Sequence, residues 1–237
     1  EHPIYLRKKK DSNIDEVILN GQDLSKDYEF FNIGDYDISD NNQIMAYSYD
    51  TLSRRIYQIR IKNLITGELF PETLENTTGS IVFANDNKTL FYGKKDPVTL
   101  RSFQIYAHEL GTDQSKDVLI FQEDDETFSC YAYKTKSNEY VVINSSSTLS
   151  DEYRLIPASS PLEKPKVFQK RERGLEYNIY HHGDFFYILT NQNHHNFSIK
   201  TCKKDSTNKE NWKEFIIGKE EVLIEGLDVF NDFLVIS

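Results

Sequence analysis

The chain has 237 residues, 38% of them hydrophobic, and a formal net charge of −10. This acidity argues against the basic footprint of general nucleic-acid binding, and no apolar run is long enough to span a membrane. The cysteines, Cys130 and Cys202, form no CxxC pair, so we expect two free thiols and no metal site or disulfide framework. Fifteen Tyr and fifteen Phe against one Met and one Trp favour β-strands.

Five strand–turn–strand segments recur along the chain. They occupy residues 36–48, 81–93, 131–145, 177–190 and 227–237. The residues that open their second strands are 46, 50, 45 and 48 positions apart, and these are Ile44, Leu90, Tyr140, Phe185 and Phe233. Their turns carry Asp, Asn, Ser or Gly, which tolerate the tight conformations of a hairpin. We interpret each segment as the inner hairpin of a repeated unit.

Two more strand candidates follow each of the first four hairpins. They lie at residues 55–63 and 68–75, 102–110 and 117–123, 152–158 and 165–170, and 196–204 and 212–218. Four strands in a period of about 45 residues are typical of a β-propeller blade. Stacked blades bury both faces of each sheet against their neighbours, which a lone sheet cannot do.

The sequence therefore predicts an all-β fold, an incomplete β-propeller of four-stranded blades. Residues 1–237 form one propeller fragment, with blades at 30–75, 79–123, 127–170 and 175–218 and partial blades at 1–21 and 221–237. We expect the natural chain to continue beyond this fragment. Residues 11–24 could seed only one short helix, and an immunoglobulin-like sandwich would need a Cys…Trp…Cys spacing that is absent.

Sequence motifs for chemistry are sparse. A GxSxG nucleophile elbow, a phosphate-binding GxxxxGK[ST] loop and a HExxH zinc motif are all absent. The histidine pairs at 181–182 and 194–195 are predicted to lie in solvated turns. The acidic run at 123–126 is predicted to be a solvated loop between blades, and the alternative is contact with a basic group on a partner domain.

The long polar connections between the second and third strands of each blade form the least ordinary pattern. They lie at residues 48–55, 94–102, 145–152 and 191–196. Because strand direction alternates, these loops and the crossings between blades should emerge on one face. Since loops on a rigid scaffold often carry function, this face, which we call the loop face, is predicted to contact a binding partner.

Residues 46–135 resemble the propeller of the oligopeptidase B (protease II) branch of the prolyl oligopeptidase family. The most specific segments are DTLSRRIYQIRIKNL (50–64), FANDNKTLFY (83–92), KDPVTL (95–100) and HELGTDQSKDVLIFQEDDETF (108–128). The resemblance implies a seven-bladed propeller joined to an α/β-hydrolase domain that holds a Ser, Asp and His triad. It also implies a serine peptidase that cuts short peptides after Lys or Arg, whose propeller covers the active site and excludes large folded substrates.

This resemblance assigns no catalytic residue, metal or cofactor to the chain. Its expected partners are the hydrolase domain of the same polypeptide and short basic peptides, with no nucleic acid and no membrane. Candidate interdomain or substrate-path contacts lie in the loops most like the family, and they are Asp50, Arg54, Arg55 and Asp96. The expected compartment is the cytoplasm, with the periplasm as the alternative.

Two other functions remain open from the residues alone. One is a stand-alone propeller that serves as a protein-interaction scaffold. The other is a propeller glycosidase, which would need carboxylates converging near the axis. The unpaired blade edges of an incomplete ring also predict self-association.

Overall fold

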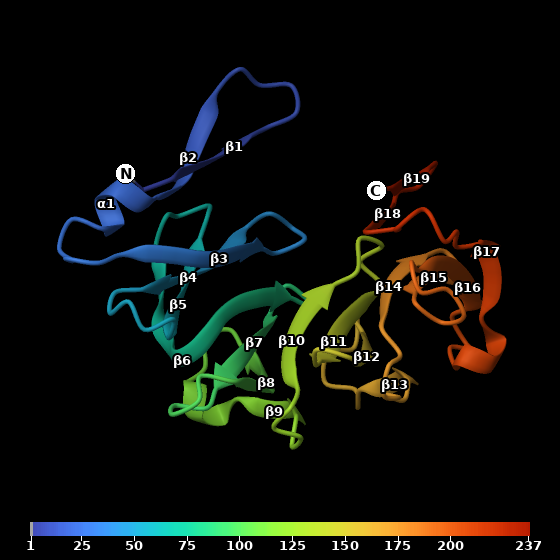
Figure 1. Cartoon of the computed structure of the whole chain (residues 1–237). Coiled ribbons are helices and arrows are strands. Elements are labelled where there is room, and N and C mark those ends of the chain that lie inside the picture. The colour runs from blue at the N-terminus through green and yellow to red at the C-terminus, as the bar shows by residue number, and fades with distance from the viewer. Residues whose placement is uncertain (1) are drawn as a thin grey trace.

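An arc of antiparallel sheets makes up the computed structural model, which describes residues 2–237 (Figure 1). It begins with a two-stranded hairpin, β1 (Ile4–Lys8) and β2 (Asp15–Asn20), followed by a four-residue helix α1 (Gly21–Leu24). Asn20 caps this helix, since its side chain accepts hydrogen bonds from the backbone N–H groups of Gln22 and Asp23. No helix among the described residues is long and apolar enough to cross a membrane.

Blades 1 and 2 share one seven-stranded sheet. Blade 1 consists of β3 (Asn32–Ile38), β4 (Ile44–Asp50), β5 (Tyr57–Asn63) and the first half of β6 (Leu69–Phe83). Blade 2 consists of the second half of β6, β7 (Thr89–Lys95), β8 (Ser102–Glu109) and β9 (Val118–Gln122), with a 3-10 turn η1 (Gln114–Lys116) before β9.

The prediction of two separate strands at 68–75 and from 81 is therefore wrong, because the backbone stays extended through the crossing. Thr77 pairs with Tyr57 of β5 and also with Lys94 of β7. Its buried hydroxyl donates to the Tyr57 carbonyl oxygen at 3.0 Å, which fixes this point of the continuous strand to blade 1.

The remaining blades are separate four-stranded sheets. Blade 3 consists of β10 (Ser129–Lys134), β11 (Tyr140–Ser146), β12 (Asp151–Pro157) and β13 (Lys166–Gln169). Blade 4 consists of β14 (Tyr177–His182), β15 (Phe185–Thr190), β16 (Ser198–Lys203) and β17 (Lys213–Ile216), with η2 (Lys209–Asn211) before β17. A final hairpin pairs β18 (Leu227–Val229) with β19 (Leu234–Ile236).

The hydrophobic core is divided among five seams, each between two successive units of the arc. The seam between blades 3 and 4 shows the pattern: Phe168 of blade 3 packs on Tyr177, Phe186 and Trp212 of blade 4. Trp212, the single tryptophan, is 8% exposed and its indole N–H donates to the Thr207 carbonyl oxygen at 2.7 Å. Comparable clusters fill the other four seams. Both faces of every complete blade are thus buried, as the repeat predicts.

Polar contacts between hairpin turns reinforce these seams on one side of the arc. The Asn41 backbone N–H donates to the Asn87 side chain at 2.9 Å, which links blades 1 and 2. The Asn85 side chain donates to the Asn138 carbonyl oxygen at 2.7 Å, which links blades 2 and 3. Asn87 and Asn138 both have positive φ, a conformation that asparagine tolerates better than most residues. Asn87 and Asn138 therefore each shape the turn of their own hairpin and also accept a hydrogen bond from the preceding blade.

Candidate functional site

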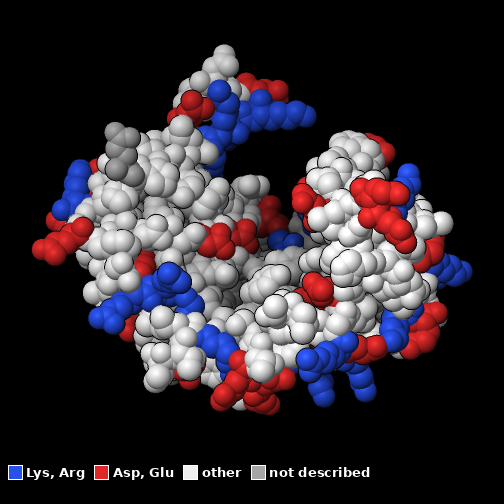
Figure 2. All heavy atoms as spheres, in the orientation of Figure 1, with Lys and Arg blue, Asp and Glu red and all other residues white. Residues whose placement is uncertain are grey.

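The inner strands of the blades lie along the concave side of the arc (Figure 1), and the space-filling view shows a central hollow there, which we call the channel (Figure 2). Its wall is formed by β3, the second half of β6, β10, β14 and β18. Strand β6 contacts β3 and β10, and β14 contacts β18, while the Tyr133 hydroxyl of β10 donates to the Ile179 carbonyl oxygen of β14 at 3.5 Å. Strands β3, β10, β14 and β18 are each an edge of their sheet. One backbone edge of each therefore faces away from its own blade, and such edges are free to pair with another extended chain.

Two carboxylates of β3 bind the backbone of the next inner strand. Asp37 accepts hydrogen bonds from the Phe83 N–H at 2.7 Å, and Asp35 accepts from the Ile81 N–H at 3.3 Å. Partial burial raises the pKa of both carboxyl groups, although the backbone donors act in the opposite direction. Acidic side chains are visible around the channel in Figure 2.

Two lysines of blade 3 form ion pairs with units that are not its direct neighbours. Lys134 lies 2.8 Å from Asp40 in the first hairpin turn of blade 1, two blades away. Lys136 lies 2.5 Å from Asp228 of β18 and 4.4 Å over the ring of Phe230. Blade 3 is therefore connected across the curve of the arc in both directions.

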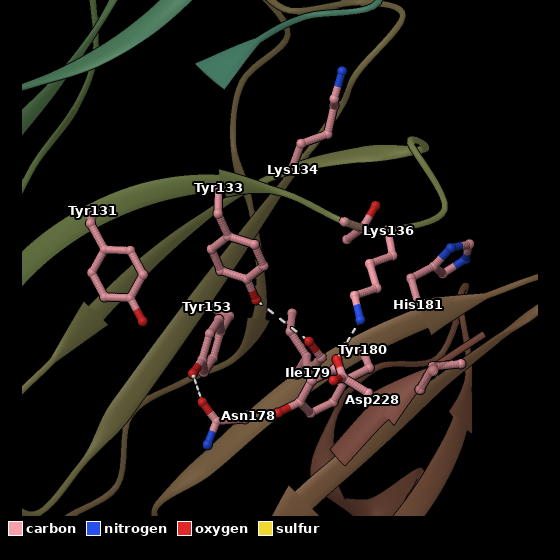
Figure 3. Close-up of a pocket in the computed structure, with 12 residues that line it drawn as sticks. Tyr131, Tyr133, Lys134, Lys136, Tyr153, Asn178, Ile179, Tyr180, His181 and Asp228 are labelled. Carbon is pink, nitrogen blue, oxygen red and sulfur yellow. Dashed lines mark hydrogen bonds and ion pairs between the residues drawn. The ribbon is translucent and has the colours of Figure 1, made fainter. Parts of the chain in front are cut away.

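A cavity of about 360 Å³ opens where β10, β14 and β18 meet. Four tyrosine rings line it, with Tyr131 and Tyr133 from β10, Tyr153 from β12 and Tyr180 from β14 (Figure 3). The Tyr153 hydroxyl donates to Asn178 at 2.9 Å. Sequence reasoning missed this cavity. The signal was present, because Tyr131 and Tyr133 are two positions apart on a strand and so share a face.

The loop face carries the residues that sequence analysis singled out. Asp50 is 3% exposed, and its carboxylate accepts the backbone N–H groups of Leu52 and Arg55 at 2.8 Å each. Asp96 accepts from Val98, Thr99 and the Thr99 hydroxyl in the next loop. Arg54 and Arg55 are exposed, and the Arg55 carbonyl oxygen accepts from Lys95 at 2.5 Å. The two aspartates thus shape their loops, while the two arginines present charge outward.

The acidic run at 123–126 is only partly the solvated loop that we predicted. Residues 124–126 are exposed, but the Glu123 side chain is 4% exposed and bonds Arg171 at 2.6 Å. Arg171 also contacts Glu152 at 3.3 Å and lies 3.9 Å over the Phe128 ring. The basic partner of this run is therefore in the chain itself, because the crossings on either side of blade 3 meet on the loop face.

The prediction that the histidines at 181–182 lie in a solvated turn is also wrong. Both end β14, since the turn comes one residue later at Gly183, which has positive φ. His181 is buried, and its Nδ1 lies 2.9 Å from the Ser137 hydroxyl of blade 3. Burial lowers its pKa. By contrast, His194 and His195 do occupy a turn, where His195 is exposed.

Neither cysteine is paired, as predicted, and both are buried. Among residues 2–237, no cluster of three or more His, Cys, Asp or Glu side chains is arranged to hold a metal ion. The features that bear on the proposals below are the aromatic cavity, the inner strand edges and the charged loop face.

Blades stacked around a channel define this chain as a β-propeller domain. The whole chain, residues 1–237, matches the family model of the prolyl oligopeptidase N-terminal β-propeller domain, and the chain belongs to that family. It is 36% identical over 254 residues to dipeptidyl aminopeptidase BI of Pseudoxanthomonas mexicana, and 30% identical over 246 residues to Protease 2 of Moraxella lacunata. Each match covers 100% of this chain and 35% of the relative, so the chain spans about a third of the length of these proteins.

Solved structures show the same fold. Oligopeptidase B from Leishmania major superposes with a TM-score of 0.90 at 24% identity, over 97% of this chain and 32% of that one. Oligopeptidase B from Trypanosoma brucei gives 0.85 at 23% identity. The predicted incomplete propeller and the family resemblance are confirmed. In its relatives, the propeller is attached to a peptidase domain in the same polypeptide.

Proposed function

We propose that this propeller is the substrate gate of a serine oligopeptidase that hydrolyses short peptides after Lys or Arg. The observation that carries the proposal is the match of the whole chain to the N-terminal propeller of prolyl oligopeptidases. Five packed seams make the arc a rigid wall beside the channel, and we propose that in the whole peptidase this wall admits slender, extended peptides. A closed site of this kind also shields the chemistry from water.

Charge supports the preference for basic peptides. The net charge is −10, and Asp35 and Asp37 lie on the channel wall without a basic side chain within ion-pair distance among the described residues. The negative electrostatic potential of these charges raises the local concentration of cationic ligands and increases their association rate.

Removal of dipeptides from the amino end of a peptide is the second candidate, since a relative at 36% identity is named dipeptidyl aminopeptidase BI. Three reporter peptides tested on the whole peptidase separate the two: an acetylated one ending in Arg, the same peptide ending in neutral citrulline, and the unacetylated Arg peptide. We expect both Arg peptides to be cleaved and the citrulline peptide to be poor. A strict need for a free amine would favour dipeptide release, and equal cleavage after citrulline would refute the basic preference.

The loop face is proposed to contact the peptidase domain through Arg54 and Arg55. We expect the double replacement by Ala to change kcat/KM and its salt dependence in the whole peptidase. Lys164→Ala is the matched control, because Lys164 is exposed in the connection between β12 and β13, on the opposite face. Equal behaviour of the two variants would reject a contact at these arginines.

A further inference from the structure

We propose that the cavity between β10, β14 and β18 is a binding site for an aromatic side chain of an extended peptide. The proposal rests on the proposed function in one respect, that peptides enter the channel. It adds a recognition element on the propeller itself, at the end of the inner strands away from the loop face.

The walls of the cavity suit a flat apolar group. Tyr131 is 45% exposed, Tyr133 and Tyr180 are half-buried, and Tyr153 forms the floor at 2% exposed. The Tyr131 and Tyr133 rings are 6.2 Å apart and tilted by 32°, and Figure 3 shows the rings side by side along one wall. Aromatic rings prefer edge-to-face or offset neighbours at this spacing, which a further ring can extend.

The charged side chains at the rim of the cavity are already paired, so the cavity presents no unpaired charge to a ligand. Lys136 is paired with Asp228, and Lys134 points away from the cavity toward Asp40 (Figure 3). Burial raises the pKa of the Tyr131 and Tyr180 hydroxyl groups, so the phenols stay neutral. A charged side chain would lose its hydration here without gaining a partner. A neutral aromatic ring loses little hydration free energy and gains free energy from burying its apolar surface.

The backbone around the cavity explains why the ligand should be extended. Strands β10 and β14 are sheet edges that flank the cavity. A peptide that pairs with such an edge gains main-chain hydrogen bonds, and every second side chain of the added strand points to the same side. One aromatic residue in the peptide can then enter the cavity while its backbone lies along β10 or β14.

The test uses the whole peptidase with its nucleophile inactivated and a fluorescent Gly/Ser-rich peptide ending in Arg. A single Phe is moved through the peptide, with Ala at the same position as the reference, and binding is read by anisotropy. We expect one Phe position to bind about tenfold more tightly than Ala, a difference of about 1.4 kcal/mol. Tyr131→Ala together with Tyr180→Ala should remove this preference, whereas Tyr131→Phe should retain it.

Tyr36→Ala is the matched control, because Tyr36 is 41% exposed on the inner strand β3 and lies outside the cavity. It should leave the Phe preference unchanged. A peptide with benzoylphenylalanine at the favoured position should cross-link to residues 131–136 or 178–181. Absence of a Phe preference, or its survival in the double variant, would overturn the proposal. Failure of the active enzyme to cleave after Arg would instead refute the proposed function, whatever the binding result.

Discussion

The ion-pair network of the loop face allows a quantitative prediction about stability. Replacing Arg171 by Met keeps an apolar stem over Phe128 but leaves Glu123, 4% exposed, without its cation. Glu152 keeps Arg154 at 2.5 Å, so only one carboxylate is orphaned. Removing one partner of a buried pair costs about 3–5 kcal/mol. Because Arg171 itself is 26% exposed, we expect a smaller loss of about 2–3 kcal/mol in the free energy of unfolding.

The matched second variant is Arg171→Met combined with Glu123→Gln, which removes both charges. It should recover about 1–2 kcal/mol relative to the single variant, since an uncharged amide is far cheaper to bury than an unpaired carboxylate. Urea unfolding followed by Trp212 fluorescence is the assay, because this single tryptophan lies in the neighbouring seam. A loss below about 0.5 kcal/mol, the range of ordinary surface changes, or no recovery in the double variant would refute the reasoning.

Four further predictions concern the same chain. Burial alone would raise the pKa of Glu123, but the hydrogen bonds and charge of Arg171 outweigh it and lower the pKa below the ordinary value of 4.5. The stability that ionised Glu123 provides is therefore present above pH 4.5 and should be lost as the pH falls through the lowered pKa. Glu123→Gln should accordingly flatten the acid limb when the free energy of unfolding is measured against pH. Gly79→Ala should cost about 2 kcal/mol, because φ is +95° and the added Cβ would lie 2.9 Å from a neighbouring ring, whereas Gly174→Ala, with positive φ but open space, should cost less when both are measured by urea unfolding. Burial raises the pKa of Cys130 and Cys202 to about 12, so a thiol reagent should label neither at pH 8 until the protein unfolds. The isolated chain should self-associate through its terminal hairpins, which expose apolar side chains, and a strictly monomeric species at high concentration in sedimentation would contradict this.

The repeat and its hairpins could be predicted because their causes are local. Turn asparagines at 42, 87 and 138 adopt positive φ in the structure, and a polar turn between two aromatic or branched runs encodes that hairpin in a few adjacent residues. Alternation within each strand also predicts which residues face a neighbouring blade, without stating which blade it is. This explains why the fold follows from the residues alone.

The errors have a common physical origin in contacts between blades. Glu123 looks like part of a solvated acidic run until Arg171, 48 positions later, lies beside it. His181 lies in β14 because the turn comes only at Gly183, and it is buried rather than solvated because blade 3 packs against it, with Ser137 in contact. The aromatic cavity likewise needs three inner strands placed around one space. Local sequence propensities contain no information about which distant residues come together between blades. Sequence-based predictions therefore fail for the polar residues at the seams.

The two lysine bridges of blade 3 change how cooperative the molecule should be. In a linear solenoid each repeat touches only the next, so stability adds up pair by pair and an end can fray independently. Here Lys134 contacts Asp40 two blades before and Lys136 contacts Asp228 in the second unit after. The curvature of the arc thus brings the end of β10 and the turn after it into contact with second neighbours on both sides, although the exposed Lys136–Asp228 pair contributes little free energy. Loosening the end of β10 and its turn would therefore weaken contacts with units far from it in sequence, so unfolding of the arc should be more cooperative than that of a linear solenoid of the same length.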